Sequence, residues 1–242
     1  MIAAGVPIDA VDDEGRTALC LALYLHQTRM AQVLLEHNAK VNTRDSHGYT
    51  PLLAALGAGL NPALAQLLLD KGADVNVADD KGRTPLHFVA VRGPVALANQ
   101  LLARHADPNV ADHDRELPLQ LAARWGTPEM LALLLDHGAD IEGRGPSGAS
   151  ALHYAVLNDR RANAELLLKR GAAVDARTEK GGTPLFFAVA DKSLQLAELL
   201  VEHGANVSIR TPQGETLVQL ARKNGQEDLA RLLIGKGAGS SR

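Results

Sequence analysis

The sequence predicts an all-helical solenoid in which short helix pairs stack side by side as a single domain over residues 1–242. Three observations predict it: a period of 33 residues, an apolar composition built from leucine and alanine, and helix signals that recur in fixed phase. A unit of two short helices cannot bury its apolar face alone, whereas stacking on both neighbours gives one continuous core.

A turn position recurs along the whole chain at intervals of 33, 34, 33, 33, 33 and 33 residues. Glycine holds all but one of these positions, which are Gly15, Gly48, Gly82, Arg115, Gly148, Gly181 and Gly214. We therefore expect repeats at approximately 12–44, 45–78, 79–111, 112–144, 145–177, 178–210 and 211–239, with 1–11 as the tail of a preceding truncated repeat.

The composition is that of a folded protein with an aliphatic core. Hydrophobic residues make up 46% of the chain and charged residues 22%, which argues against disorder. A net charge of -3 gives no general attraction to nucleic acid or to anionic membranes. The chain has 40 Leu and 39 Ala but only 7 aromatic residues, so the core must be built from aliphatic helix formers.

Each repeat has the same signals for a first and a second helix. The first helix starts with phrases such as TPLLAA from Thr50, where proline occupies the first turn and its missing N–H costs little. The second helix ends in phrases such as LLLDKGADVN from Leu67. A glycine with positive φ is expected to end this helix at Gly72, Gly138, Gly171 and Gly204.

These repeats, with both phrases in fixed phase over nearly the whole chain, closely resemble ankyrin repeats. The resemblance implies antiparallel helix pairs, β-hairpin-like finger loops at right angles to them, and a concave groove. Finger tips and the ends of the first helices would line that groove. At these helix ends the sequence has Tyr24 and Leu25, Gly57 and Ala58, Val91 and Arg92, Arg124 and Trp125, Leu157 and Asn158, Ala190 and Asp191, and Lys223 and Asn224.

The fourth repeat departs most from the pattern, since Arg115 replaces the turn glycine and Leu117 the threonine two residues later. An arginine that keeps the positive φ of glycine costs about 1 kcal/mol. Either structural drift or selection for binding a partner would explain this departure, and both alternatives stay open.

Binding to a protein partner is the function that the resemblance implies. Tryptophan and arginine often dominate binding energy because they present a large area for little loss of rotamer entropy. The only tryptophan lies at a first-helix end, so affinity is expected to centre on Trp125, Arg124 and Arg92. The alternative, that Trp125 packs as core, stays open. Further partner-binding residues are expected at Asn158, Tyr49, Arg83, Glu116, Arg144 and Arg177.

Several arginines recur on the fingers. A stripe of them would receive an acidic segment of a partner. The alternative is that they are solvated or paired with finger carboxylates such as Asp45, Asp175 and Glu179. The arginines are Arg44, Arg144, Arg177 and Arg210 just before the turns, with Arg16 and Arg83 at other finger positions.

We expect no catalytic, cofactor-binding or metal-binding residues. His87 and His153 occupy the first-helix phrase, where a ring can bond to nearby turns, and other histidines suit the dipole at second-helix ends. The only cysteine, Cys20, cannot form an intramolecular disulfide and is expected to be a small buried residue.

The sequence thus predicts a monomeric, non-enzymatic interaction scaffold without nucleic-acid or membrane partners. It has no visible secretory signal, so we expect a cytoplasmic location, although a chain already trimmed of its signal peptide would look the same. One alternative is an inhibitor, an immunity protein or a bacterial effector module that binds an enzyme. Another is the repeat portion of a larger protein with a domain before Met1.

Overall fold

The computed structural model describes residues 7–57, 59–211 and 213–238. Within them the chain is all-helical, with fourteen α-helices, one short 3-10 helix at Pro146–Gly148, and isolated β-bridges in place of strands. This confirms the predicted fold class. The chain forms two compact units, one ending at Asp114 and the next beginning at Arg115. Most of the predicted N-terminal tail, residues 1–6, lies outside the described residues, as does Ala58.

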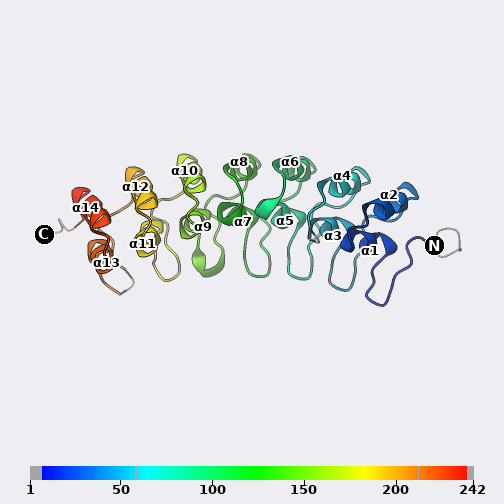
Figure 1. Ribbon diagram of the computed structural model, residues 1–242, viewed down its shortest axis with the longest axis horizontal. Coiled ribbons are helices and arrows are strands. Elements are labelled where there is room, and N and C mark those ends of the chain that lie inside the picture. The colour runs from blue at the N-terminus through cyan, green and yellow to red at the C-terminus, as the bar shows by residue number, and fades with distance from the viewer. Residues whose placement is uncertain (1–6, 58, 212, 239–242) are drawn as a thin grey trace. The chain divides into compact units, whose positions relative to one another are not determined.

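The first unit contains three helix pairs (Figure 1). The first helix of each pair packs on the first helix of the next, so α1, α3 and α5 form one row, and α2 packs on α4 beside it. The pairs are α1 (Ala18–Tyr24) with α2 (Thr28–Glu36), α3 (Pro51–Gly57) with α4 (Pro62–Asp70), and α5 (Pro85–Arg92) with α6 (Val95–Ala103).

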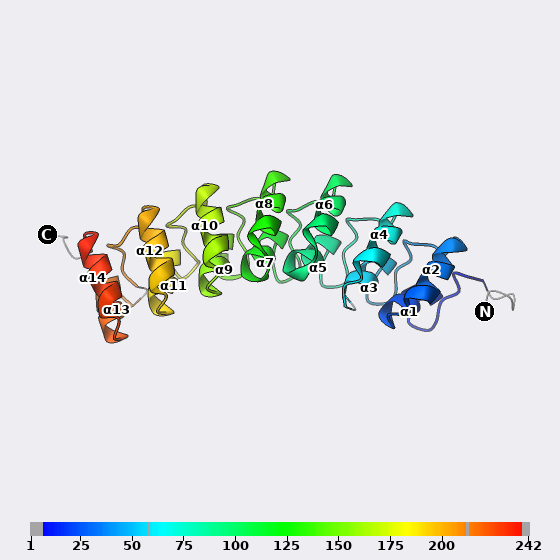
Figure 2. The same ribbon diagram turned by 45° about the horizontal axis from the view of Figure 1, so that its top comes forward.

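The second unit contains four pairs and repeats this plan. Its first helices form one row and its second helices another, as Figure 2 also shows within the unit. The pairs are α7 (Pro118–Trp125) with α8 (Pro128–Asp136), α9 (Ala151–Leu157) with α10 (Arg161–Lys169), α11 (Pro184–Ala190) with α12 (Leu194–Glu202), and α13 (Leu217–Lys223) with α14 (Glu227–Gly235).

The predicted helix signals act as expected. Proline is the first residue of α3, α5, α7 and α11. The glycines that end the second helices have φ values of 84°, 84°, 89° and 86° at Gly72, Gly138, Gly171 and Gly204. In the first and third repeats Asn38 and His105 take this left-handed conformation instead, with φ of 60° and 64°.

The finger loops are hairpin-like turns joined to one another through the backbone. In the second repeat the N–H of Asp45 donates to the carbonyl of Tyr49 at 3.0 Å and closes the turn. The next finger is attached by the N–H of Asp80, which donates to the carbonyl of His47 at 3.1 Å. Arg115 has a φ of 65°, so it does keep the left-handed conformation of the glycines at this position. The turn position is therefore left-handed both where it holds glycine and where it holds arginine.

The core is aliphatic throughout each unit. In α3, for example, Leu52, Leu53 and Ala54 are completely buried. The buried polar side chains that start the first helices bond to the helix itself, as Thr17 does by accepting from the N–H of Cys20. Cys20 is buried, and burial raises the pKa of its thiol, which leaves it protonated and unreactive.

Candidate functional site

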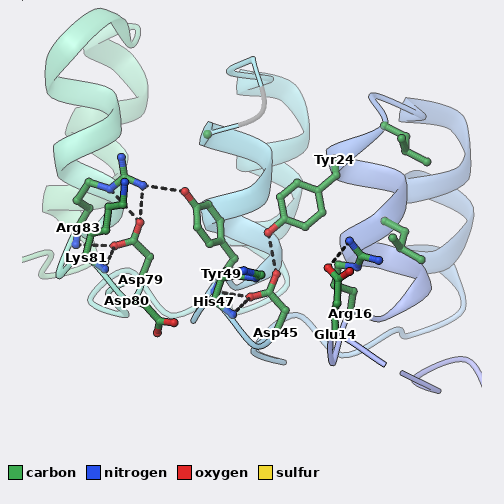
Figure 3. Close-up of a pocket in the computed structure, with 13 residues that line it drawn as sticks. Glu14, Arg16, Tyr24, Asp45, His47, Tyr49, Asp79, Asp80, Lys81 and Arg83 are labelled. Atoms are coloured by element: carbon green, nitrogen blue, oxygen red, sulfur yellow. Dashed lines mark hydrogen bonds and ion pairs between the residues drawn. The ribbon is translucent and has the colours of Figure 1, made fainter. Parts of the chain in front are cut away.

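A groove of about 530 Å³ opens in the first unit, where the fingers of the first three repeats meet the ends of α1 and α3 (Figure 3). Tyr24 and Leu25 come from the end of α1, and the remaining side chains come mainly from the fingers. Glu14, Asp45, Tyr49, Asp80 and Arg83 are among them. The groove therefore combines aromatic rings with carboxylates and a guanidinium.

Three aromatic rings follow one another along this side of the first unit. The ring centroids of Tyr24 and Tyr49 are 6.0 Å apart, and those of Tyr49 and Phe88 are 6.3 Å apart. A Cβ at Gly57 would lie 3.3 Å from ring carbons of both Tyr49 and Phe88. Glycine at the end of α3 thus leaves room for the two rings and keeps the groove open.

Arg83 is held by a neighbouring carboxylate and two rings. Its Nη2 donates to Asp79 Oδ2 at 2.7 Å and to Tyr49 Oη at 2.8 Å. Its guanidinium also lies 4.8 Å from the centroid of the Phe88 ring. Burial alone would raise the pKa of Asp79, but hydrogen bonds from Arg83 and from backbone N–H groups outweigh burial and lower it. Asp79 and Arg83 are therefore a charged pair that neutralises itself.

Asp45 is buried at the base of the groove and is bonded differently. Its Oδ1 accepts from the backbone N–H groups of His47 and Tyr49, each at 2.9 Å. Its Oδ2 accepts from Tyr24 Oη at 2.8 Å. Burial and the bond to this carboxylate raise the pKa of Tyr24 far above its ordinary value, so the phenol stays a proton donor.

A second cluster lies in the second unit at the end of α7. The guanidinium of Arg124 lies 4.7 Å from the centroid of the Trp125 ring, and its Nη1 is 3.5 Å from a carboxylate oxygen of Glu116. Trp125 is 40% exposed, so its ring is a surface feature stacked on arginine and is not buried in the core. The cluster is an aromatic and charged patch on the first-helix end.

The structure distributes the predicted partner-binding residues between the two units. In the first unit it brings Tyr49 and Arg83 together, and it places Arg92 exposed at the end of α5. In the second unit it joins Trp125, Arg124 and Glu116. The remaining residues there have other local partners: Asn158 donates to the carbonyl of Tyr154, and Arg144 to the carbonyls of Gly148 and Arg177.

Most of the finger arginines bond to the protein itself. Arg16 pairs with Asp12 and Glu14. Arg44 and Arg210 each donate to a finger carbonyl at 2.8 Å, that of Ala78 and that of Gly214. Arg16 and Arg210 bond within their own fingers and Arg44 bonds to the next one, so these three side chains have partners within the protein, as the paired interpretation predicts. Of the carboxylates suggested as partners, Glu179 lies 3.9 Å from Arg115, whereas Asp45 bonds to Tyr24.

Sequence reasoning missed the role of Asp45 and placed Tyr24 only among the groove positions. The available signal lay four residues after the finger aspartate. The first and third repeats have arginine there, Arg16 and Arg83, whereas the second repeat has Tyr49. It also missed Asn163, which is buried in α10 and donates to the carbonyls of Ala122 and Ala123 at 3.3 and 3.0 Å. Asn163 thereby satisfies carbonyl groups at the end of α7, the helix that carries Trp125.

The described residues contain no group of three or more His, Cys, Asp or Glu side chains arranged to hold a metal ion. None of their helices combines the length and the apolar character that a membrane span requires.

A family model and a solved structure both match this chain, and both describe ankyrin repeats. A sequence model described as "Ankyrin repeats (3 copies)" matches overlapping segments at residues 1–79, 39–112, 54–144, 86–178 and 171–241. The chain is also similar to the crystal structure of the human ASB11 ankyrin repeat domain, at 26% sequence identity and a TM-score of 0.81, covering 93% of this chain and 100% of that chain. The search of curated proteins found no match. The chain belongs to the ankyrin-repeat family.

Proposed function

We propose that this protein is a non-enzymatic, monomeric scaffold that binds a protein partner through its finger loops and the ends of its first helices. Ankyrin repeats are in general modules of protein-protein interaction. The finer assignment, a partner held against this particular side of the repeats, is our proposal. A cytoplasmic location stays a prediction.

The position of the exposed apolar side chains carries the proposal. Six large hydrophobic residues are exposed among those that the structure describes. Three of these lie at the same place in different repeats, the end of the first helix: Leu25, Trp125 and Leu157. Exposed apolar area that recurs at one structural position is typical of a surface that a partner covers.

We assign affinity to Trp125, Arg124 and Arg92, which present large side chains at these helix ends. Specificity is assigned to side chains beside them or on the fingers. Each unit is held by backbone hydrogen bonds between its fingers and by a packed core, so little within a unit has to be ordered on binding and the entropic cost there is small. The residues assigned to specificity are Asn158, Tyr49, Arg83, Glu116, Arg144 and Arg177.

The test is a random peptide library displayed on phage and selected on the immobilised chain, followed by affinity measurement on variants. We expect the double substitution Trp125→Ala with Arg124→Ala to weaken the peptides that bind the second unit by at least about 2 kcal/mol, roughly thirtyfold in Kd. The matched control is Ile234→Ala, which removes a comparably exposed apolar side chain from α14. Equal affinities of the double variant and the control would contradict the assignment of affinity.

A further inference from the structure

The first three finger aspartates occupy equivalent positions but have different partners. In the first repeat Asp12 pairs with Arg16 at 2.8 Å, and in the third repeat Asp79 pairs with Arg83 at 2.7 Å. In both repeats the arginine lies four residues after the aspartate. These two carboxylates are thus neutralised within their own finger.

The second repeat has tyrosine at the position of the arginine, so its finger supplies no guanidinium to Asp45. Among the residues that the structure describes, Asp45 makes no ion pair, and its three bonds come from Tyr24 Oη and from two backbone N–H groups. An ionised carboxylate can accept about four hydrogen bonds, so the side chain retains acceptor capacity. Because all the donors to the Asp45 carboxylate are neutral groups, its negative charge is not compensated, and a cation from outside the chain would be attracted to it.

The rings beside Asp45 suit the same kind of ligand. The Tyr24 and Tyr49 rings are inclined at 52° to each other and line the groove next to the carboxylate (Figure 3). A cation over the face of an aromatic ring is attracted by the ring quadrupole. The third repeat shows this combination inside the protein, where Arg83 bonds to Asp79 and lies over the Phe88 ring.

The charge of the groove also favours a cation. Its lining includes Arg16 and Arg83, but both are paired with carboxylates. Lys81 adds one positive charge at the finger tip, next to the exposed carboxylate of Asp80. With Glu14, Asp45 and Asp79 the lining holds four carboxylates against three cationic side chains. Among the described residues Glu14 and Asp79 form ion pairs with arginines, whereas Asp45 and Asp80 form none, and of these two Asp45 is the buried one.

We propose that the groove of the first unit receives an arginine or lysine side chain of the partner polypeptide. The cationic head donates to Asp45 and lies against the rings of Tyr24 and Tyr49. The next repeat has the corresponding arrangement within the protein, where the guanidinium of Arg83 donates to Asp79 and lies over the Phe88 ring. This inference rests on the proposed function and adds the chemistry of the partner, a segment with a basic anchor residue.

The test uses the peptide selection on the whole chain, with two variants that change the groove. Asp45→Asn removes the charge while its amide oxygen can still accept from the two backbone N–H groups. Tyr49→Arg places arginine where the first and third repeats have it, so the chain itself supplies the guanidinium to Asp45. Glu36→Gln is the matched control, because it removes one exposed carboxylate at the end of α2, outside the groove lining.

We expect peptides enriched in arginine or lysine on the wild type and on Glu36→Gln, and loss of that enrichment on both groove variants. For the best peptide, replacing its arginine with the neutral isostere citrulline should weaken binding to the wild type about tenfold and binding to Asp45→Asn hardly at all. Thermal unfolding of each variant shows that it is folded.

Each other outcome overturns the inference. Selected peptides that are neutral or acidic, or a basic preference that persists on Asp45→Asn and Tyr49→Arg, would contradict the basic anchor and leave the scaffold function standing. The absence of any selected peptide on the wild-type chain would contradict the scaffold function as well. The two failures are therefore distinguishable.

Discussion

Gln120 and His153 occupy the same position in successive repeats and make equivalent hydrogen bonds. Gln120 accepts from the N–H of Leu117 at 3.0 Å and donates to the carbonyl of Gly143 at 3.0 Å. His153 Nδ1 accepts from the N–H of Ser150, and its Nε2 donates to the carbonyl of Gly182, both at 3.2 Å. Each side chain thus joins the start of its helix to the following finger, but only the histidine can take up a proton.

Protonation of His153 should destabilise the fold in acid. The ring is completely buried, and burial lowers the pKa of His153 from 6.5 to about 4. The unfolded chain therefore binds this proton at a higher pH than the folded chain. The neutral His153 ring therefore stabilises the fold fully above about pH 6.5. As the pH falls from 6.5 to 4, the free energy of unfolding should drop by about 3 kcal/mol on account of this ring.

The substitution His153→Gln isolates this contribution, because glutamine makes the same bonds in the fourth repeat. We expect the variant to lose less stability than the wild type between pH 6.5 and 4, measured by urea unfolding. His137→Gln, at the exposed end of α8, should keep the wild-type decline. Parallel declines in wild type and His153→Gln would show that the buried ring does not govern acid stability.

The buried amide of Asn163 should tolerate an apolar replacement better than an acidic one. The other repeats have apolar residues at this position, such as Leu97 and Leu196, which are buried. Asn163→Leu should therefore cost about 1 kcal/mol of unfolding free energy, the value of a lost hydrogen bond. Asn163→Asp should cost about 3 kcal/mol at neutral pH, since a buried carboxylate would face carbonyl oxygens.

Acid should partly restore Asn163→Asp, because the protonated carboxyl can donate to one of those carbonyls. Chemical denaturation over a range of pH measures the difference between the two variants. A leucine variant less stable than the aspartate variant at neutral pH would contradict the role given to the amide.

The left-handed turn at Arg115 should be relieved by glycine. Its φ of 65° is costly for any residue with a Cβ, and its ion pair with Glu179 is exposed and 3.9 Å long. We expect Arg115→Gly to be more stable than Arg115→Ala by about 1 kcal/mol. The alanine variant controls for the loss of the arginine side chain, and equal melting temperatures of the two variants would contradict strain at this turn.

The hydroxyl of Tyr24 should stabilise the first unit through Asp45. Tyr24→Phe removes the 2.8 Å bond to the buried carboxylate and leaves the ring in place. A hydrogen bond to a charged group contributes about 1.5–3 kcal/mol to the free energy of unfolding. Because the groove is open to water, we expect Tyr24→Phe to lower this free energy by about 1.5 kcal/mol. Equal unfolding free energies of Tyr24→Phe and wild type would show that water replaces the phenol.

The repeat plan follows from the sequence because its causes are local. Glycine at Gly48 or Gly72 permits a positive φ at its own position, and proline at the start of α3 suits the first turn of a helix. The leucine and alanine content predicts the aliphatic core in the same way. Each of these effects is contained within a few neighbouring residues, so the period of 33 residues was enough to predict the helix pairs.

The partners of individual polar side chains were decided only by the tertiary structure. Tyr24 reaches Asp45 across 21 residues of sequence, and Asn163 reaches Ala122 across 41. Whether a finger arginine faces a partner or fastens the next finger depends on rotamers and distances between repeats, which the spacing of the sequence does not contain. The sequence determined the stacking of helix pairs and the position of the only tryptophan, whereas tertiary packing decided that Asp45 lies beside two tyrosine rings without a cation of its own.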